Sequence, residues 1–203
     1  MEKFNQKTFD NFALESGIIG FFKEPIKLKS GRFSTWYVNW RTVAQDVYLI
    51  DKLTDFVISF VISHKLEVDT FYGVPEGASK LGVLTQYKWA KSQKNFAKGS
   101  HNLAMGRGKE KDHGDPKDRS FLAMPKGRTI VIEDVTSTGS SLIATVEKLR
   151  ALNIEVVAAI ALTNRNELND DKKTVEEVMK EKNIPYFAMS NASILLKKHE
   201  SHH

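Results

Sequence analysis

Cysteine is absent from all 203 residues of the chain, and its absence excludes several kinds of chemistry. Without thiols the chain forms no disulfide, no thiolate metal site and no cysteine nucleophile. Cytosolic proteins rarely depend on disulfides, so the absence favours a cytoplasmic protein.

Long apolar runs are absent too. No run approaches the ~20 residues that are needed to span a bilayer, so we expect no membrane contact. Residues 1–10 are polar and mixed in charge, and they lack the apolar core of a signal peptide, which argues against export. The length favours one compact domain.

The excess of positive charge is small. The 30 Lys and Arg residues against 25 Asp and Glu give a net charge of +5, which suits a protein that handles phosphorylated small molecules. An acid-free stretch with Lys88, Lys91, Lys94 and Lys98 keeps nucleic-acid contact open as an alternative. A solvated basic surface explains this stretch more simply, so we do not expect nucleic acid as a partner.

Hydrophobic periodicity predicts helices that alternate with strands. Apolar residues at helical spacing predict helices over 49–64, 78–90 and 140–152. Short apolar runs predict strands over 68–72, 129–132 and 156–162. The alternation indicates an α/β fold with a mainly parallel central sheet flanked by helices. Ligands bind beyond the carboxyl ends of such strands, so the loops after Tyr72, Ile132 and Leu162 are candidate binding loops.

Two adjacent carboxylates, Glu133 and Asp134, follow the strand predicted over 129–132. Buried carboxylates are costly, so this pair should face a polar ligand or a metal ion. Carboxylates accept hydrogen bonds from vicinal ribose hydroxyls and hold Mg²⁺.

A loop rich in hydroxyl groups comes next and leads into a helix. Its candidate binding residues are Thr136, Ser137, Thr138, Gly139 and Ser140. A helix N-terminus with unpaired N–H groups suits a phosphate, and a glycine allows close approach of the anion. The simpler alternative is an acidic helix start whose Ser and Thr residues are N-caps.

The stretch IVIEDVTSTGSS, residues 130–141, resembles the donor-binding signature of type I phosphoribosyltransferases. The resemblance implies that Glu133 and Asp134 hold the ribose hydroxyls of 5-phosphoribosyl diphosphate and that the following loop holds its 5-phosphate. It implies Mg²⁺ as cofactor, held mainly by the substrate, with the same two carboxylates as candidate ligands. Thr136 departs from the pattern, because that position is usually aliphatic.

Residues 28–39, LKSGRFSTWYVN, are similar to the N-terminal segment of orotate phosphoribosyltransferases. A cation beside flat apolar surfaces suits a planar anionic pyrimidine. The resemblance implies that Lys29, Tyr37 and Val38 contact orotate, although an aromatic residue is common at the position of Val38. The alternative for Trp36 and Tyr37 is plain core packing.

A second segment, residues 107–114, resembles the flexible catalytic loop of the same family. The charged stretch 105–119 should be an exposed, mobile loop. Cations delivered by a closing loop would stabilise negative charge on a leaving diphosphate. The candidate catalytic residues are Arg107, Lys109, Lys111 and His113, together with Asp134 of the acidic pair. Gly108 stands where the family often has a basic residue, and the alternative is a solvated surface loop.

Two further loops complete the resemblance. Arg165, which follows the strand predicted over 156–162, resembles the arginine that binds the orotate carboxylate, with Asn164 in place of the usual acid. A surface salt bridge is the alternative. The expected diphosphate loop, in which Glu76 is atypical, consists of Gly73, Val74, Pro75, Glu76 and Gly77.

Taken together, the resemblance implies the type I phosphoribosyltransferase fold in one domain, residues 1–203. A small N-terminal hood would cover about 1–45, the core about 46–196, and a tail 197–203. It implies an orotate phosphoribosyltransferase of pyrimidine biosynthesis that acts as a homodimer with shared active sites. The alternatives are a transferase for another base, such as a purine, and a non-catalytic regulator of the same fold that senses the donor.

Overall fold

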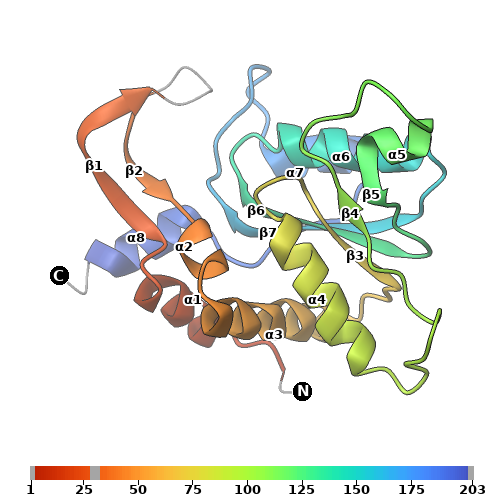
Figure 1. The fold of residues 1–203 in the computed structure, drawn as a ribbon. Coiled ribbons are helices and arrows are strands. Elements are labelled where there is room, and N and C mark those ends of the chain that lie inside the picture. The colour runs from red at the N-terminus through yellow and green to blue at the C-terminus, as the bar shows by residue number, and fades with distance from the viewer. Residues whose placement is uncertain (1–2, 28–32, 201–203) are drawn as a thin grey trace.

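The computed structural model describes residues 3–27 and 33–200, apart from the side chains of residues 116 and 117. Its centre is a parallel sheet with the strand order β3-β6-β7-β8 (Figure 1). The strands are β3 (Thr70–Gly73), β6 (Thr129–Thr136), β7 (Val156–Asn164) and β8 (Tyr186–Ala188). The predicted α/β fold with a mainly parallel sheet is therefore confirmed.

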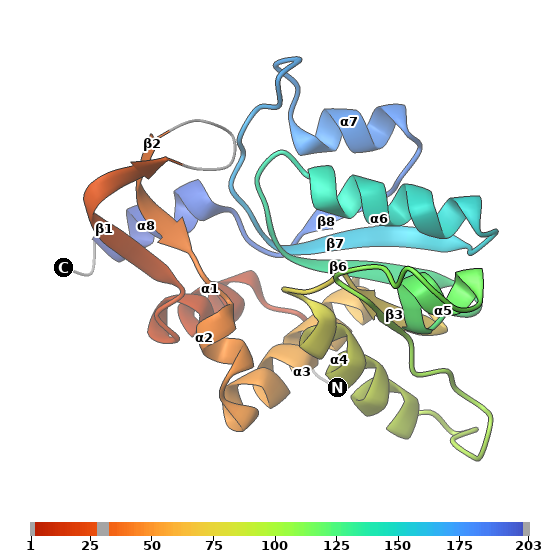
Figure 2. The same ribbon diagram turned by 45° about the horizontal axis from the view of Figure 1, so that its top comes forward.

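Alternating side chains of β6 divide the core into two layers. Ile130 and Ile132 pack with one hydrophobic cluster, whereas Val131 packs with the other, because successive residues of a strand face opposite sides of the sheet. The first cluster is covered by α1 (Gln6–Glu15), α3 (Val47–Ser63), α4 (Ser79–Lys91) and α8 (Ala192–Glu200). The second is covered by α6 (Ser140–Ala151) and α7 (Val175–Glu181), on the opposite side of the sheet in Figure 2.

An antiparallel hairpin of β1 (Ile19–Lys27) and β2 (Phe33–Val38) stands beside this core. The chain leaves β2 through Trp40 and the short helix α2 (Arg41–Ala44). Trp40 is only 2% exposed. Its indole N–H donates to the Thr163 hydroxyl on β7 at 2.9 Å, and this hydroxyl lies 2.8 Å from that of Ser190. The hairpin is thus anchored to the carboxyl end of the sheet.

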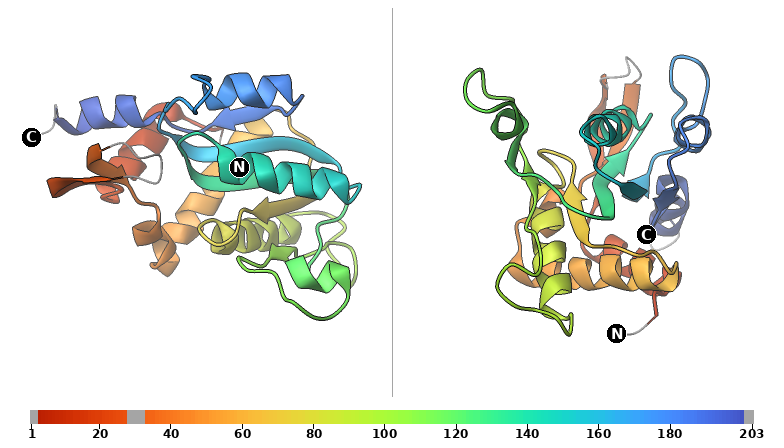
Figure 3. Two further views of the ribbon diagram at one scale, coloured as in Figure 1. Left: turned by 90° about the horizontal axis from the view of Figure 1, so that it is seen from above. Right: turned by 90° about the vertical axis from the view of Figure 1, so that its right-hand side faces the viewer.

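Residues 105–123 form a second projection, here called the arm. It contains β4 (Met105–Gly106), α5 (Pro116–Ser120) and β5 (Phe121–Ala123). Its backbone is paired across the arm, since the N–H groups of Arg107 and Lys111 donate to the carbonyls of Ser120 and Arg119 at 2.9 and 3.0 Å. Figure 3 shows the arm, the loop after β7 and the hairpin rising on the same side of the sheet.

The arm is also tied to α6. The Glu110 carboxylate accepts from the Ser120 hydroxyl at 2.7 Å and pairs with the Lys148 ammonium. The stretch 107–115 is exposed, as expected, apart from a half-buried Arg107. These contacts nevertheless give it an ordered path that its composition did not predict.

Several element boundaries differ from those predicted. β6 runs to Thr136 and includes the acidic pair, and β7 runs to Asn164, because backbone pairing between these strands continues to their ends. The residues expected to begin a tail at 197 instead continue helix α8 to Glu200. In this helix the Lys198 ammonium pairs with Asp10 of α1 at 2.6 Å. Among the described residues, no helix is long and apolar enough to cross a membrane.

The Trp40–Thr163 hydrogen bond provides a test of how the hairpin is anchored. Thr163→Val keeps the shape of the side chain but leaves the buried indole N–H without its acceptor, so we expect a loss of about 1–3 kcal/mol of unfolding free energy. Urea unfolding measures this loss. Thr35→Val, at an exposed position of β2, should change the unfolding free energy by less than about 0.5 kcal/mol. Equal values for the two variants would contradict the anchoring role.

Candidate active site

A cavity of about 560 Å³ lies at the carboxyl end of the sheet, where β6 leads into α6 and β7 ends. It brings predicted donor-binding residues and the predicted acceptor arginine to one place. The residues lining it include Glu133, Thr136, Ser137, Thr138, Gly139, Ser140, Arg165 and Glu167. Loops more than 20 residues apart in the sequence therefore meet, as the carboxyl ends of neighbouring parallel strands must.

The hydroxyl-rich loop is held in a conformation that only its glycine adopts easily. Gly139, the residue before α6, has φ +78°. A Cβ atom there would lie 2.3 Å from a methyl carbon of Val175. The Thr138 and Ser140 hydroxyls lie 2.9 Å apart across this turn. The turn places the start of α6, where backbone N–H groups lack partners within the helix, at the lining of the cavity, a geometry that suits an anion.

The two carboxylates of β6 lie in different surroundings. Glu133 is buried and lines the large cavity. Burial, reinforced by the charge of Asp134, raises its pKa to about 9. Asp134 instead faces the loop after β3, since a Cβ atom on Gly77 would lie 2.9 Å from its Oδ2.

The loop after β3, residues 73–78, is compact. The Val74 N–H donates to the Ile132 carbonyl at 2.8 Å, and Gly73 packs so closely on the Ala78 carbonyl that a side chain would not fit. The peptide bond between Pro75 and Glu76 is cis. This loop therefore lies directly beside the end of β6.

A smaller cavity of about 190 Å³ joins this loop to the arm. Val74, Pro75, Arg107 and Gly108 line it, and Ser141 lines both this cavity and the larger one. The Glu76 side chain lies against Gly108, where a Cβ atom would come within 2.3 Å of it. The two residues that departed most clearly from the family pattern are therefore in contact.

Arg165 is nearly buried, with 9% of its side chain exposed. Its Nε donates to Oε1 of Glu167 at 2.9 Å, its Nη2 to the Ser34 hydroxyl at 3.4 Å, and its guanidinium carbon lies 4.5 Å from the centre of the Trp36 ring. The salt bridge named as the alternative is present, but it is not exposed at the surface, because the pair is enclosed between β2 and the end of β7. A stacked, buried guanidinium is well placed to bind a planar anion.

Polar contacts behind Arg165 fix the turn that carries it. Its backbone N–H donates to the Thr136 carbonyl at 2.8 Å, and the Thr136 hydroxyl lies 2.7 Å from that of Tyr186. The Asn164 amide donates to Glu176 of α7 at 2.7 Å. A carboxylate from α7 thus lies next to the position where the family usually has an acid.

The structure separates the residues expected to contact orotate. Lys29 lies outside the described residues. Val38 packs against the core cluster. Tyr37 packs over Gly20 and Phe22, with ring centres of Phe22 and Tyr37 4.8 Å apart. Since side chains alternate along β2, Trp36 rather than Tyr37 reaches Arg165.

Trp36 was considered in the sequence only as a flat apolar surface beside the base, with core packing as the alternative, and Glu167 was given no role. The alternation of Ser34, Trp36 and Val38 along β2 was the available signal for Trp36. Glu167 lies in residues 163–167, the segment around Arg165 that resembles the family, but its spacing did not predict a contact with Arg165.

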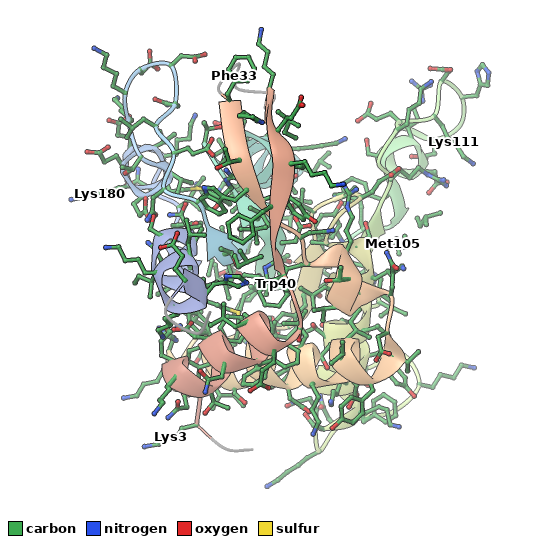
Figure 4. All side chains as sticks on the ribbon, turned by 90° about the vertical axis from the view of Figure 1, so that its left-hand side faces the viewer. Lys3, Phe33, Trp40, Met105, Lys111 and Lys180 are labelled. Carbon is green, nitrogen blue, oxygen red and sulfur yellow. The ribbon has the colours of Figure 1, made fainter. Side chains whose placement is uncertain are left out.

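The candidate catalytic cations do not line the large cavity among the residues described. Arg107 lines the smaller one, where its Nε donates to the Asp118 carbonyl at 3.0 Å. Lys109, Lys111 and His113 are exposed. Figure 4 shows Lys111 far out on the arm, a projection separate from the hairpin whose tip is marked by Phe33.

The described residues contain no group of three or more His, Asp or Glu side chains that could hold a metal ion by themselves. Glu133 and Asp134 supply two carboxylates, of which one is buried. This donor set fits a divalent cation only when a ligand supplies most of the oxygen atoms.

Comparison with solved structures defines the class of the fold. An orotate phosphoribosyltransferase from Aeropyrum pernix matches with a TM-score of 0.72 at 21% identity, over 94% of this chain and 97% of that one. A Mycobacterium tuberculosis orotate phosphoribosyltransferase solved with 5-phosphoribosyl diphosphate matches with a TM-score of 0.61 at 15% identity, covering 94% and 98%. An adenine phosphoribosyltransferase from Leishmania donovani matches with a TM-score of 0.65 at 11% identity, covering 97% and 85%. The fold is that of the type I phosphoribosyltransferases, and it is shared by enzymes for different bases.

Sequence comparison narrows this class. The chain is 25% identical over 197 residues to the orotate phosphoribosyltransferase of Ralstonia pickettii, covering 94% of this chain and 84% of that protein. It is 27% identical over 198 residues to that of Polynucleobacter necessarius, covering 95% and 85%. No family model matches the chain. The resemblance to the orotate phosphoribosyltransferases, predicted from short segments, is confirmed over almost the whole chain.

The buried carboxyl of Glu133 predicts a dependence of stability on pH. Its pKa rises from an ordinary value of 4.5 to about 9 on folding. Between pH 5 and pH 8 this carboxyl is already mostly deprotonated in the unfolded chain but stays protonated in the folded chain, so it lowers the unfolding free energy as pH rises. Glu133→Gln should therefore gain about 1–3 kcal/mol relative to the natural protein between pH 5 and pH 8.

Urea unfolding at the two pH values measures this difference. Glu155→Gln, at an exposed position before β7, serves as the matched control and should track the natural protein. If Glu133→Gln also tracks it, the carboxyl of Glu133 is not held protonated by burial.

Proposed function

We propose that the protein transfers the 5-phosphoribosyl group from 5-phosphoribosyl diphosphate to orotate, which yields orotidine 5-monophosphate and diphosphate. The observation that carries the proposal is the single cavity that joins the hydroxyl-rich loop of β6–α6 to the stacked Arg165. The sequence similarity to orotate phosphoribosyltransferases supports the choice of orotate, since the fold is also found in an adenine enzyme.

The donor binds along the carboxyl ends of β3 and β6. Residues 136–140 hold its 5-phosphate at the start of α6, and Glu133 and Asp134 accept hydrogen bonds from the ribose hydroxyls. The loop 73–77 holds the diphosphate with its backbone N–H groups. The contact between Gly77 and Asp134 supports this order, because it brings the diphosphate loop next to the ribose-binding carboxylate.

The acceptor binds between the hairpin and the end of β7. Arg165 donates to the orotate carboxylate, and the Trp36 ring that stacks on its guanidinium forms one apolar wall. Lys29 completes the acceptor site by family resemblance. Val38 supports the wall from within the core, whereas Tyr37 shapes the outer face of the hairpin.

Mg²⁺ is the cofactor that this donor chemistry calls for. The ion would be held mainly by the donor, with Glu133 and Asp134 as the protein's contribution, and when bound it screens the charge of the diphosphate. The raised pKa of Glu133 in the ligand-free protein implies that this carboxyl releases a proton when cation and donor arrive.

The protein's residues accelerate the transfer by orientation and charge rather than by a covalent intermediate. The ring nitrogen of the orotate anion, which has given its proton to solvent, forms a bond to ribose C1 while the bond from C1 to the diphosphate oxygen breaks. Negative charge grows on the diphosphate, and the cations Arg107, Lys109 and Lys111 stabilise it, with His113 as a hydrogen-bond donor.

Lys111 and His113 of the arm act on the site of a second copy of the chain. Lys111 is exposed and lies far out on the arm, apart from the hairpin tip marked by Phe33 (Figure 4). A homodimer with shared sites accounts for a charged arm that does not line its own large cavity. We place this enzyme of pyrimidine biosynthesis in the cytoplasm.

A comparison of acceptor bases tests the activity directly. With 5-phosphoribosyl diphosphate and Mg²⁺, orotate should be consumed with one diphosphate released per turnover, and adenine, hypoxanthine and guanine should not react. The change in base absorbance measures the reaction. Turnover of a purine in place of orotate would overturn the acceptor. A protein that binds the donor without any turnover, and binds RNA or DNA in a strongly salt-dependent way, would be a regulator instead.

Mixed dimers test the shared site. Lys111→Ala should lower turnover by about 100-fold or more with little change in donor affinity, as loss of transition-state charge stabilisation does. Asp134→Asn should impair the other half of the site. A mixture of the two variants, dissociated and reassembled, forms some dimers that contain one intact site.

Such a mixture should recover activity well above either variant alone. Lys111→Arg provides the matched control, because it keeps the cation. No recovery in a mixture that has been shown to exchange subunits would mean that the arm serves its own site.

A further inference from the structure

The two oxygens of Glu167 are used unequally. Oε1 accepts from Nε of Arg165 at 2.9 Å, and only 13% of the Glu167 side chain is exposed. Oε2 is buried and has no hydrogen-bond partner in the part of the chain that the structure describes. Buried carboxylates usually gather several hydrogen bonds. Within the described ranges, Arg165 is therefore the one hydrogen-bond partner of the Glu167 carboxylate.

The bond from Glu167 decides which edge of the guanidinium is open. A guanidinium binds a carboxylate either side-on, through Nε and one terminal nitrogen, or end-on, through both terminal nitrogens. Glu167 occupies Nε, and Trp36 covers one face of the group at 4.5 Å. The Ser34 hydroxyl accepts a long bond of 3.4 Å from Nη2. The end-on edge is thus the one left for a ligand.

We propose that Glu167 is a positioning residue that makes the acceptor carboxylate bind Arg165 end-on. The proposal rests on the function proposed above, because it takes a planar base carboxylate as the acceptor. The orotate carboxylate is attached directly to the ring, so the edge of the guanidinium that it meets fixes the direction of the ring. One open edge gives one orientation, in which the ring nitrogen faces the ribose.

A purely structural ion pair makes a different prediction. It would stabilise the fold, and its loss would affect both substrates or neither. A positioning role affects the acceptor selectively, and it depends on the presence of Arg165. The two roles are therefore separated by the Michaelis constants for the two substrates and by a double-mutant cycle.

The experiment measures KM for orotate and for the donor in the full-length protein. Glu167→Ala should raise the KM for orotate about tenfold to a hundredfold, the loss expected for a hydrogen bond to a charged group, and leave the donor KM unchanged. Glu167→Gln keeps an oxygen that accepts from Nε, so its KM for orotate should stay within about threefold. Asp171→Asn, which removes a charge from an exposed position of the same loop, is the matched control and should change neither constant.

The double variant completes the test. In an Arg165→Ala background, adding Glu167→Ala should change the orotate affinity by less than about twofold, because no guanidinium is left to position. Calorimetry gives this affinity where turnover is too low to measure. The double variant removes both buried charges, so it serves even if Glu167→Ala alone fails to fold.

Three results would overturn the proposal: an unchanged orotate KM in Glu167→Ala, an equal rise in the donor KM, or a full effect in the Arg165→Ala background. If any of these occurs while the natural protein turns over orotate, the proposed function stands and the role of Glu167 falls. If the natural protein does not use orotate, both fall together.

Discussion

The site depends on one buried positive charge. The Arg165 guanidinium is enclosed between a strand of the N-terminal hairpin and the end of β7, and burial of a charge is tolerated only when it is paired. Glu167 pairs it and Trp36 covers it. Because these partners come from both sides of the site, the hairpin and the sheet must meet in one relative position. The acceptor half of the proposed site is therefore built around this charge.

The proposed donor half rests on backbone geometry instead. β6 delivers two carboxylates to the sheet edge, and the turn at Gly139 starts α6 directly behind them. The proposed diphosphate loop is held beside the end of β6 by the hydrogen bond from the Val74 N–H to the Ile132 carbonyl. The β6 carboxylates and the two loops beside them depend on few side chains from elsewhere in the chain. This is why a short stretch of sequence suffices to propose the donor, whereas the proposed acceptor site consists of residues that lie far apart in the sequence.

The contrast between local segments and contacts of distant residues also decides how much of the fold and of the site could be predicted from the sequence. Helices and strands with strong periodicity, such as 49–64 and 129–132, appear close to where they were expected, because local pattern and burial agree. β1 and β8 were missed, since β1 is mostly exposed and β8 has only three residues. The Glu110–Lys148 tether and the contact of Trp36 with Arg165 were missed for another reason. Each joins segments whose proximity follows from the assembled sheet and not from any local pattern.

The pairing of Asp10 with Lys198 ties the first helix to the last. Asp10 is buried, and its other oxygen accepts from Gln6, which also reaches the Met189 carbonyl. Contacts with so large a sequence separation form slowly, because the intervening chain must first be ordered. During synthesis on the ribosome, α1 therefore waits for most of the chain before its polar face is satisfied. Strand β8 (Tyr186–Ala188) is also made late, so the fourth strand of the sheet and the partner of Asp10 become available at nearly the same stage of synthesis.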